Sequence, residues 1–205
     1  MSQPGTKSPF EYTGGNPALD FVNTIDSRGS EMRKDLLTDY SRMVQWAEGA
    51  KLIGSKTGDR LRRLASDAPG QAQSVLRRAL QLREAIYEVF SAVVEQRGTP
   101  TAALACLNDA AQKASEHARI IQTSKRFSWE WIQPEENLDS ILWSVARSAS
   151  ELLTSDDLAY VGTCASEPCG WLFLDQTKNH RRRWCEMKNC GNRDKARRYY
   201  HRQKR

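Results

Sequence analysis

The sequence predicts a mainly α-helical protein whose last quarter forms a small cysteine-rich module. Three observations predict this fold class: apolar residues with helical spacing through most of residues 16–153, one short stretch with strand-like alternation, and four of the five cysteines after residue 160. We therefore expect a helical domain over residues 1–157 and a second module over residues 158–205.

Length and composition fit this division. A chain of 205 residues is long enough for one ordinary domain plus a small module, and 39% hydrophobic with 27% charged residues is typical of soluble globular proteins. No run approaches the roughly 20 apolar residues of a membrane-spanning helix, and Met1–Phe10 lacks the apolar core of a signal peptide. We expect a cytoplasmic protein that has no membrane partner.

Helix-start and helix-stop residues mark the first elements. Asn16 can cap a helix that begins at Pro17, because proline lacks only an N–H that would have no partner there. Thr38 offers the next cap, and Gly49 is a suitable stop. A third, short helix is expected over residues 59–65.

The strongest periodicity runs over residues 72–97 and predicts a central helix that ends before Gly98. Its apolar stripe consists of Val75, Ala79, Leu82, Ile86, Val89 and Val93. Thr99 and Pro100 begin a further helix, and we expect the two to pack as an antiparallel pair.

The pattern changes after residue 116. Apolar and polar residues alternate towards Ile132, which predicts a short β-hairpin within residues 117–132. Pro134 then precedes a last helix of this domain, which carries apolar residues from Leu138 to Leu153.

Paired cysteines are the sharpest feature of the chain. Cys164 and Cys169 are separated by four residues, as are Cys185 and Cys190, and fifteen residues lie between the pairs. Two such pairs can place four thiolates about 2.3 Å from one zinc ion, whereas two disulfides, the alternative, are rare in the cytoplasm. Four sulfur ligands leave no open position, so we expect a structural Zn²⁺. Cys106 lies on an apolar helical stripe, where a core position is expected.

The residues around these pairs predict a hairpin and a terminal helix. Residues 171–175 are strand-like, residues 176–180 turn-like, and the chain is expected to return through residues 181–184. Gly191 can make a tight turn and Asn192 can cap a helix that continues to His201.

Positive charge is concentrated at the C-terminal end. Residues 178–205 carry 12 Lys or Arg and two acidic residues, a net charge of +10, whereas the remainder has a net charge of −4. This distribution favours an anionic partner, with nucleic acid first and a membrane surface second, over a merely solvated face. The expected nucleic-acid contacts are Arg181, Arg182, Arg183, Arg193, Lys195, Arg197 and Arg198.

Two segments resemble known families. The string from Trp184 to Arg198, with Cys190-Gly191-Asn192-Arg193 at its centre, closely resembles the CGNR zinc finger, and Cys169–Asp175 is similar to its first half. Gly14–Thr24 and Leu36–Trp46 resemble the ABATE domain of stress-induced transcription regulators. The resemblance implies a mainly α-helical bacterial regulator that binds DNA, and it implies no reaction or ligand.

The opening ABATE-like motif permits two interpretations. On a helix Asp20 shares a face with Asn23 and Thr24, among apolar neighbours. These polar groups can satisfy backbone donors and acceptors inside the domain. Alternatively they form an effector pocket for a small molecule, to which Trp46 or Arg28 also contributes.

The function that we expect is DNA binding by the zinc module, with the helical domain sensing an effector or assembling a homodimer. RNA binding and a zinc-organised protein-interaction module are the alternatives, and exposed tyrosines would favour RNA. We expect no enzyme, because the three histidines lack metal-ligand spacing and no nucleophile elbow or phosphate-binding loop is present.

Overall fold

The computed structural model describes residues 8–31 and 33–203. Within them lie seven α-helices: α1 (Pro17–Val22), α2 (Tyr40–Gly49), α3 (Ser55–Asp67), α4 (Pro69–Val94), α5 (Thr101–Glu116), α6 (Ser140–Leu153) and α7 (Asn192–Gln203). Six short strands form three antiparallel pairs: β1 (Ile25–Asp26) with β2 (Lys34–Asp35), β3 (Ala118–Thr123) with β4 (Arg126–Trp131), and β5 (Val161–Thr163) with β6 (Leu172–Leu174). The predicted fold class is confirmed.

Most of Met1–Phe10, for which the sequence analysis expects no signal peptide, lies outside the described residues. Among the helices of the described part, none is long and apolar enough to cross a membrane.

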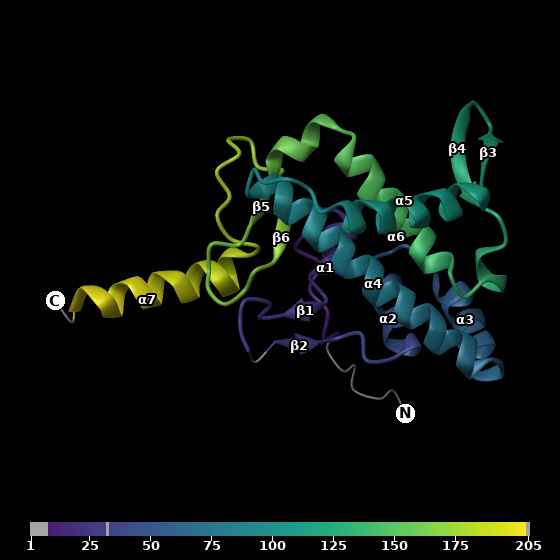
Figure 1. The fold of residues 1–205 in the computed structure, drawn as a ribbon, viewed down its shortest axis with the longest axis horizontal. Helices are drawn as coiled ribbons and strands as arrows, with labels where there is room; N and C mark the ends of the chain where they lie inside the picture. The colour runs from purple at the N-terminus through teal and green to yellow at the C-terminus, as the bar shows by residue number, and fades with distance from the viewer. Residues whose placement is uncertain (1–7, 32, 204–205) are drawn as a thin grey trace.

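Helix α4 runs through the middle of the helical body, as its apolar spacing predicts (Figure 1). Ala79 and Ile86 are fully buried, and α1, α2, α5 and α6 all pack against this helix. Burying each large apolar side chain contributes about 1.5 to 3 kcal/mol, so the stripe on α4 anchors the core. The helix predicted after Pro100 is α5, which packs against α4.

The first two helices differ in detail from the prediction. Asn16 caps α1 through its side-chain oxygen, but α1 ends at Val22, and Ile25 lies in β1. The cap of α2 is Asp39 and not Thr38, because the Asp39 backbone is extended and its carboxylate accepts a hydrogen bond from the Arg42 N–H at 2.8 Å. A carboxylate also interacts favourably with the positive end of the helix dipole.

Three later helices begin or end away from the predicted positions. Helix α3 is longer than residues 59–65 at both ends, and α4 starts at Pro69 and already ends at Val94. Helix α6 begins only at Ser140, because Pro134–Glu136 forms the separate 3-10 turn η1.

The predicted hairpin at residues 117–132 is confirmed as β3 and β4, which pair in continuous register from Ala118 with Trp131 to Thr123 with Arg126. It projects from the helical body at the end of the molecule opposite α7 (Figure 1).

The hydrophobic core continues into the cysteine module. Leu172 and Leu174 of β6 are buried in the same cluster as Phe21 and Ile86 of the helical body. The cysteines form a second, small cluster with Trp171 and Phe173, which alternate with the two leucines along the strand. Strand β6 therefore has one face in each cluster. The boundary between residues 157 and 158 stays a prediction.

Candidate metal centre and nucleic-acid interface

The four paired cysteines meet at one point of the structure. Cys164 and Cys169 lie in the loop that joins β5 to β6, and Cys185 precedes the helical turn η3 (Met187–Gly191), which contains Cys190. All four Sγ atoms lie within 4.8 Å of one another, with 3.7 Å between Cys169 and Cys185 and 3.5 Å between Cys185 and Cys190. Sulfurs at the corners of a tetrahedral zinc site are about 3.8 Å apart, so this cluster fits one Zn²⁺.

The electrostatics of the cluster also fit a cation. All four cysteines are buried free thiols and not the two disulfides of the alternative interpretation. Hydrogen bonds from Cys169 and Cys185 lower the pKa of the Cys164 thiol to about 2, whereas hydrogen bonds to Cys164 and Cys169 raise the pKa of Cys185. The negative charge of one thiolate thus disfavours the ionisation of a second thiol in this buried space, and a bound divalent cation would offset that repulsion.

The predicted hairpin of residues 171–184 is wrong in its second strand. Strand β6 pairs with β5, which precedes the first cysteine pair, while residues 181–184 are not a strand. The other edge of β6 is taken by the N-terminal segment, because the Leu174 N–H donates to the Gly14 carbonyl at 2.7 Å. The Asp175 carboxylate holds the return loop by accepting the backbone N–H groups of Thr177 and Arg182.

Four of the predicted nucleic-acid residues have side-chain partners inside the protein, and two of these, Arg182 and Arg193, connect parts of the cysteine module. The Arg182 guanidinium donates to the carbonyl oxygens of Thr13 at 2.7 Å, Leu174 at 3.2 Å, Trp184 at 3.0 Å and also Cys185. Its role is therefore to join the return loop to the N-terminal segment.

Arg193 is the second of these residues. Its Nη2 lies 3.3 Å from the Cys190 sulfur, and its Nε donates to the Ser166 hydroxyl at 3.2 Å. An N–H donor to a zinc-ligating thiolate stabilises the negative charge on that sulfur.

Arg193 is nevertheless exposed, as are the other five predicted contacts, Arg181, Arg183, Lys195, Arg197 and Arg198. The guanidinium groups of Arg183 and Arg198 lie over the Trp184 ring, at 5.2 and 5.9 Å from its centre. Helix α7, which carries the last three of the five, projects from the module (Figure 1). The exposed ion pair of Arg197 with Glu167, at 2.9 Å, is of the kind that contributes little to stability.

The start of α7 differs from the prediction. Asn192 is not an N-cap, because its backbone is helical and η3 continues directly into α7. Its side-chain amide donates to the Lys188 carbonyl at 3.0 Å. The buried carboxylate of Asp194, in the first turn, instead pairs with Arg198 at 2.7 Å.

The structure buries the three residues of the opening motif and gives each a partner within the protein. The Asp20 carboxylate accepts the Gly14 N–H at 2.7 Å, and the Thr24 hydroxyl donates to the Phe21 carbonyl. The Asn23 amide donates to the Leu172 carbonyl at 2.8 Å and accepts the Leu172 N–H at 3.0 Å, as a neighbouring strand would. These contacts match the structural interpretation of the motif. Since α1 ends at Val22, the three do not share one helical face.

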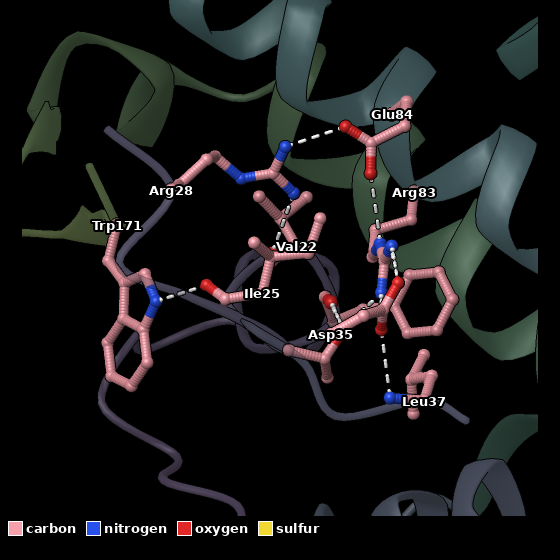
Figure 2. Close-up of polar contacts among 10 residues, drawn as sticks. Val22, Ile25, Arg28, Asp35, Leu37, Arg83, Glu84 and Trp171 are labelled. Carbon is pink, nitrogen blue, oxygen red and sulfur yellow. Dashed lines mark hydrogen bonds and ion pairs between the residues drawn. The ribbon is translucent and has the colours of Figure 1, made fainter. Parts of the chain in front are cut away.

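An ion-pair network around two buried arginine side chains, Arg28 and Arg83, holds the segment after α1 (Figure 2). Arg83 donates to the Asp35 carboxylate at 2.6 and 2.8 Å and to the Thr24 hydroxyl at 3.1 Å. Glu84 accepts from Arg28 at 2.6 Å. Sequence reasoning missed this network, although the spacing contains a signal: Arg83 lies four residues after Ala79 and three before Ile86, on the buried face of α4.

The same segment, which follows α1, also forms hydrogen bonds with the cysteine module. The backbone N–H of Arg28 donates to the Cys169 carbonyl at 3.1 Å, and that of Gly29 to the Pro168 carbonyl at 3.0 Å. The Trp171 indole N–H donates to the Ile25 carbonyl at 2.7 Å (Figure 2). The first cysteine pair thus rests on the helical domain through three hydrogen bonds.

A surface pocket of about 780 Å³ lies among α4, α5 and α6. Arg78, His117 and Asp139 contribute polar groups, and the His117 ring stacks on Trp143 at 4.0 Å. Cys106, expected in the core, is only half-buried and lines this pocket. Asp20, Asn23 and Thr24 do not line it.

Comparison with known families agrees with the geometry. Residues 15–156 match the family model ABATE, described as "Putative stress-induced transcription regulator", and residues 160–203 match the CGNR zinc finger. No curated protein matches the sequence. The family models and the four clustered cysteines together show that the chain belongs to the ABATE family and ends in a CGNR zinc finger able to bind one zinc ion.

Proposed function

We propose that this protein is a DNA-binding regulator of stress-induced transcription whose zinc finger presents α7 and the loop before it to the DNA backbone. The observation that carries the proposal is the group of five exposed basic side chains on a helix and loop that are anchored at the cysteine cluster. The family description supports a role in transcription.

When bound, Zn²⁺ supplies a fixed link among the four thiolates and performs no reaction, because the four sulfurs fill its coordination shell. The surrounding side chains hold the contact surface in place. Arg193 connects the base of α7 to Cys190, and Arg182 connects the return loop to Thr13. Arg181, Arg183 and the cations of α7 therefore keep one orientation towards a ligand.

The exposed cations position the protein on phosphates, while sequence is read by side chains that reach base edges. If each of the five neutralises one phosphate, the logarithm of affinity falls with the logarithm of salt concentration with a slope of about −4.5. One or two of the arginines would read guanine in the major groove.

RNA is the second candidate, and one observation favours it. Tyr199 and Tyr200 are 59% and 65% exposed on α7, where unpaired bases can stack on their rings. Competition by single-stranded RNA that exceeds competition by duplex DNA would replace the first proposal with this one.

The decisive experiment is selection of the zinc-loaded full-length protein against a random duplex DNA library. An enriched sequence motif supports the proposal. Retention of DNA without enrichment, at the affinity of any basic protein, contradicts it and favours the remaining alternative, a finger that binds an acidic protein.

We infer a cytoplasmic location, since reduced cysteines and bacterial DNA occur there, and we assign no reaction to the chain. If the helical domain senses a small molecule, the pocket among α4, α5 and α6 is a better candidate than the Asp20, Asn23 and Thr24 group, whose polar atoms have internal partners.

A further inference from the structure

The β3–β4 hairpin presents an apolar face to solvent. Ile120, Phe127 and Trp129 are 62%, 72% and 55% exposed. The register places Ile120 opposite Trp129 and Gln122 opposite Phe127, so the three apolar side chains share one face of the hairpin. Contiguous exposed apolar side chains of this size are typical of an interaction surface.

Contacts with α6 hold the base of the hairpin, so only its outer part is free to contact a partner. Trp131 lies 5.9 Å from Trp143 of α6, and the Arg147 guanidinium lies 4.9 Å from the Trp129 ring. On the polar face Arg119 pairs with Glu130 at 2.6 Å, directly across the two strands. The hairpin is thus a defined two-stranded platform and not a collapsed loop.

The outer edge of β4 complements a second copy of itself. Among the described residues β4 pairs only with β3, so the backbone groups on its other side have no strand partner. Two copies related by a two-fold axis at Ser128 place Arg126 opposite Glu130 and Phe127 opposite Trp129 of the second copy. Opposite charges then meet on one face and aromatic rings meet on the other.

The edge of β3 lacks this property. A two-fold axis at Ile120 places Arg119 opposite Ile121, and an axis at Ile121 places it opposite Thr123. Self-complementarity is therefore specific to β4. This self-complementarity favours a second copy of the chain over an unrelated protein as the partner of β4, because an unrelated strand requires no symmetry within Arg126–Glu130.

We propose that β4 pairs antiparallel with β4 of a second copy, with Ser128 at the two-fold axis, to form a four-stranded sheet in a homodimer. This goes beyond DNA binding and does not depend on it. The hairpin lies at the opposite end of the molecule from α7, so the pairing leaves both basic helices free (Figure 1). A standard protein interface buries about 800 Å² on each partner. A single pair of strands buries less than this, so we expect the dimer to dissociate on dilution.

Charge reversal tests this register. Arg126→Glu places like charges opposite each other twice per dimer, and so does Glu130→Arg. In sedimentation velocity runs on the zinc-loaded full chain over a concentration series, each variant alone dimerises about tenfold more weakly than the wild type. An equimolar mixture of the two forms a heterodimer of wild-type affinity, because one chain then carries two acidic groups and the other two basic groups at the contact.

Lys56→Glu is the matched control, since it makes the same charge change at an exposed position of α3, outside the hairpin, and leaves the dimer intact. Thermal unfolding followed by circular dichroism checks that Glu130→Arg, which also loses the pair with Arg119, remains folded. A wild-type protein that stays monomeric throughout overturns the proposal. So does a dimer that the single variants leave unchanged, or one that they weaken and the mixture fails to restore.

Discussion

The indole Nε1–H of Trp171 donates to the carbonyl oxygen of Ile25 at 2.7 Å, a buried hydrogen bond between residues 146 positions apart. It joins the strand next to the cysteines to the segment that follows α1. The zinc finger and the ABATE domain therefore share one structural framework.

Trp171→Phe tests this link. The substitution keeps an aromatic ring in the small cluster but leaves the Ile25 carbonyl without its donor, which costs about 1 to 3 kcal/mol of unfolding free energy. Denaturant unfolding of the zinc-loaded protein measures the change, and the zinc content stays the same. An unfolding free energy equal to that of the wild type would show that the hydrogen bond contributes nothing.

Cys185→Ser tests the metal centre. Its sulfur lies close to both Cys169 and Cys190, so its loss opens the cluster. We expect the bound zinc to fall from one per chain to a small fraction, and hydrogen exchange to increase in α7 and in the loop at residues 27–29, while α4 stays protected.

Cys106→Ser is the control for that experiment, because Cys106 lies in the pocket among the helices. Elemental analysis is expected to find one zinc per chain in this variant. Unchanged zinc in Cys185→Ser would refute the four-cysteine site.

Arg183→Ala combined with Arg197→Ala tests the DNA surface. Removal of two phosphate contacts weakens duplex binding for every sequence and makes the salt dependence shallower by about 1.8 in slope. Fluorescence anisotropy over a salt series measures both quantities. The double variant Arg60→Ala and Arg63→Ala removes two exposed arginines of α3 and should change neither.

Arg182→Ala separates the two roles among the basic residues. Because its guanidinium has four carbonyl partners, we expect this variant to lose stability before it loses any specific DNA contact. A stable variant with selectively weaker DNA binding would return Arg182 to the contact surface.

Asp20 gives the stability a pH dependence. Burial raises the pKa of Asp20 from 3.8 to about 6, although the hydrogen bond from Gly14 and the charge of Arg182 lower it. The folded protein therefore binds this proton more tightly than the unfolded chain, and the free energy of unfolding falls as pH rises from about 4 to about 6. Two pKa units correspond to about 3 kcal/mol.

Asp20→Asn removes that titration. The stability of the variant relative to the wild type should increase between pH 4 and pH 7, measured as the difference in Tm. The difference is the relevant quantity because both proteins release the metal ion in acid. Asp26→Asn, at an exposed carboxylate, serves as the control, and a pH-independent difference for Asp20→Asn would contradict the assignment.

The sequence predicted correctly those features that depend on residues close together in the chain. Asn16 before Pro17 predicted the start of α1, and the spacing of the cysteines predicted a cluster that the sulfur positions support. The partner of β6 was predicted wrongly, because the choice depends on residues far away in the sequence. Gly14 and Asn23 occupy one edge of that strand, and no pattern within residues 160–190 encodes them.

The buried arginine network shows the same division. Arg83 lies on the apolar face of α4, which the spacing indicates, but its partner Asp35 comes from a segment 48 positions earlier. Helical periodicity therefore predicts that a charged side chain lies inside the protein, but it does not predict which residue neutralises that charge.

The two hydrogen bonds between the Asn23 amide and Leu172 make the zinc finger dependent on a segment that is synthesised before it. A finger that is excised, or fused to an unrelated protein, loses the hydrogen-bond partner of one edge of β6. A functional exchange of fingers between related proteins therefore requires that the segment around Asn23 be exchanged as well, so we expect these two parts of the chain to be inherited together.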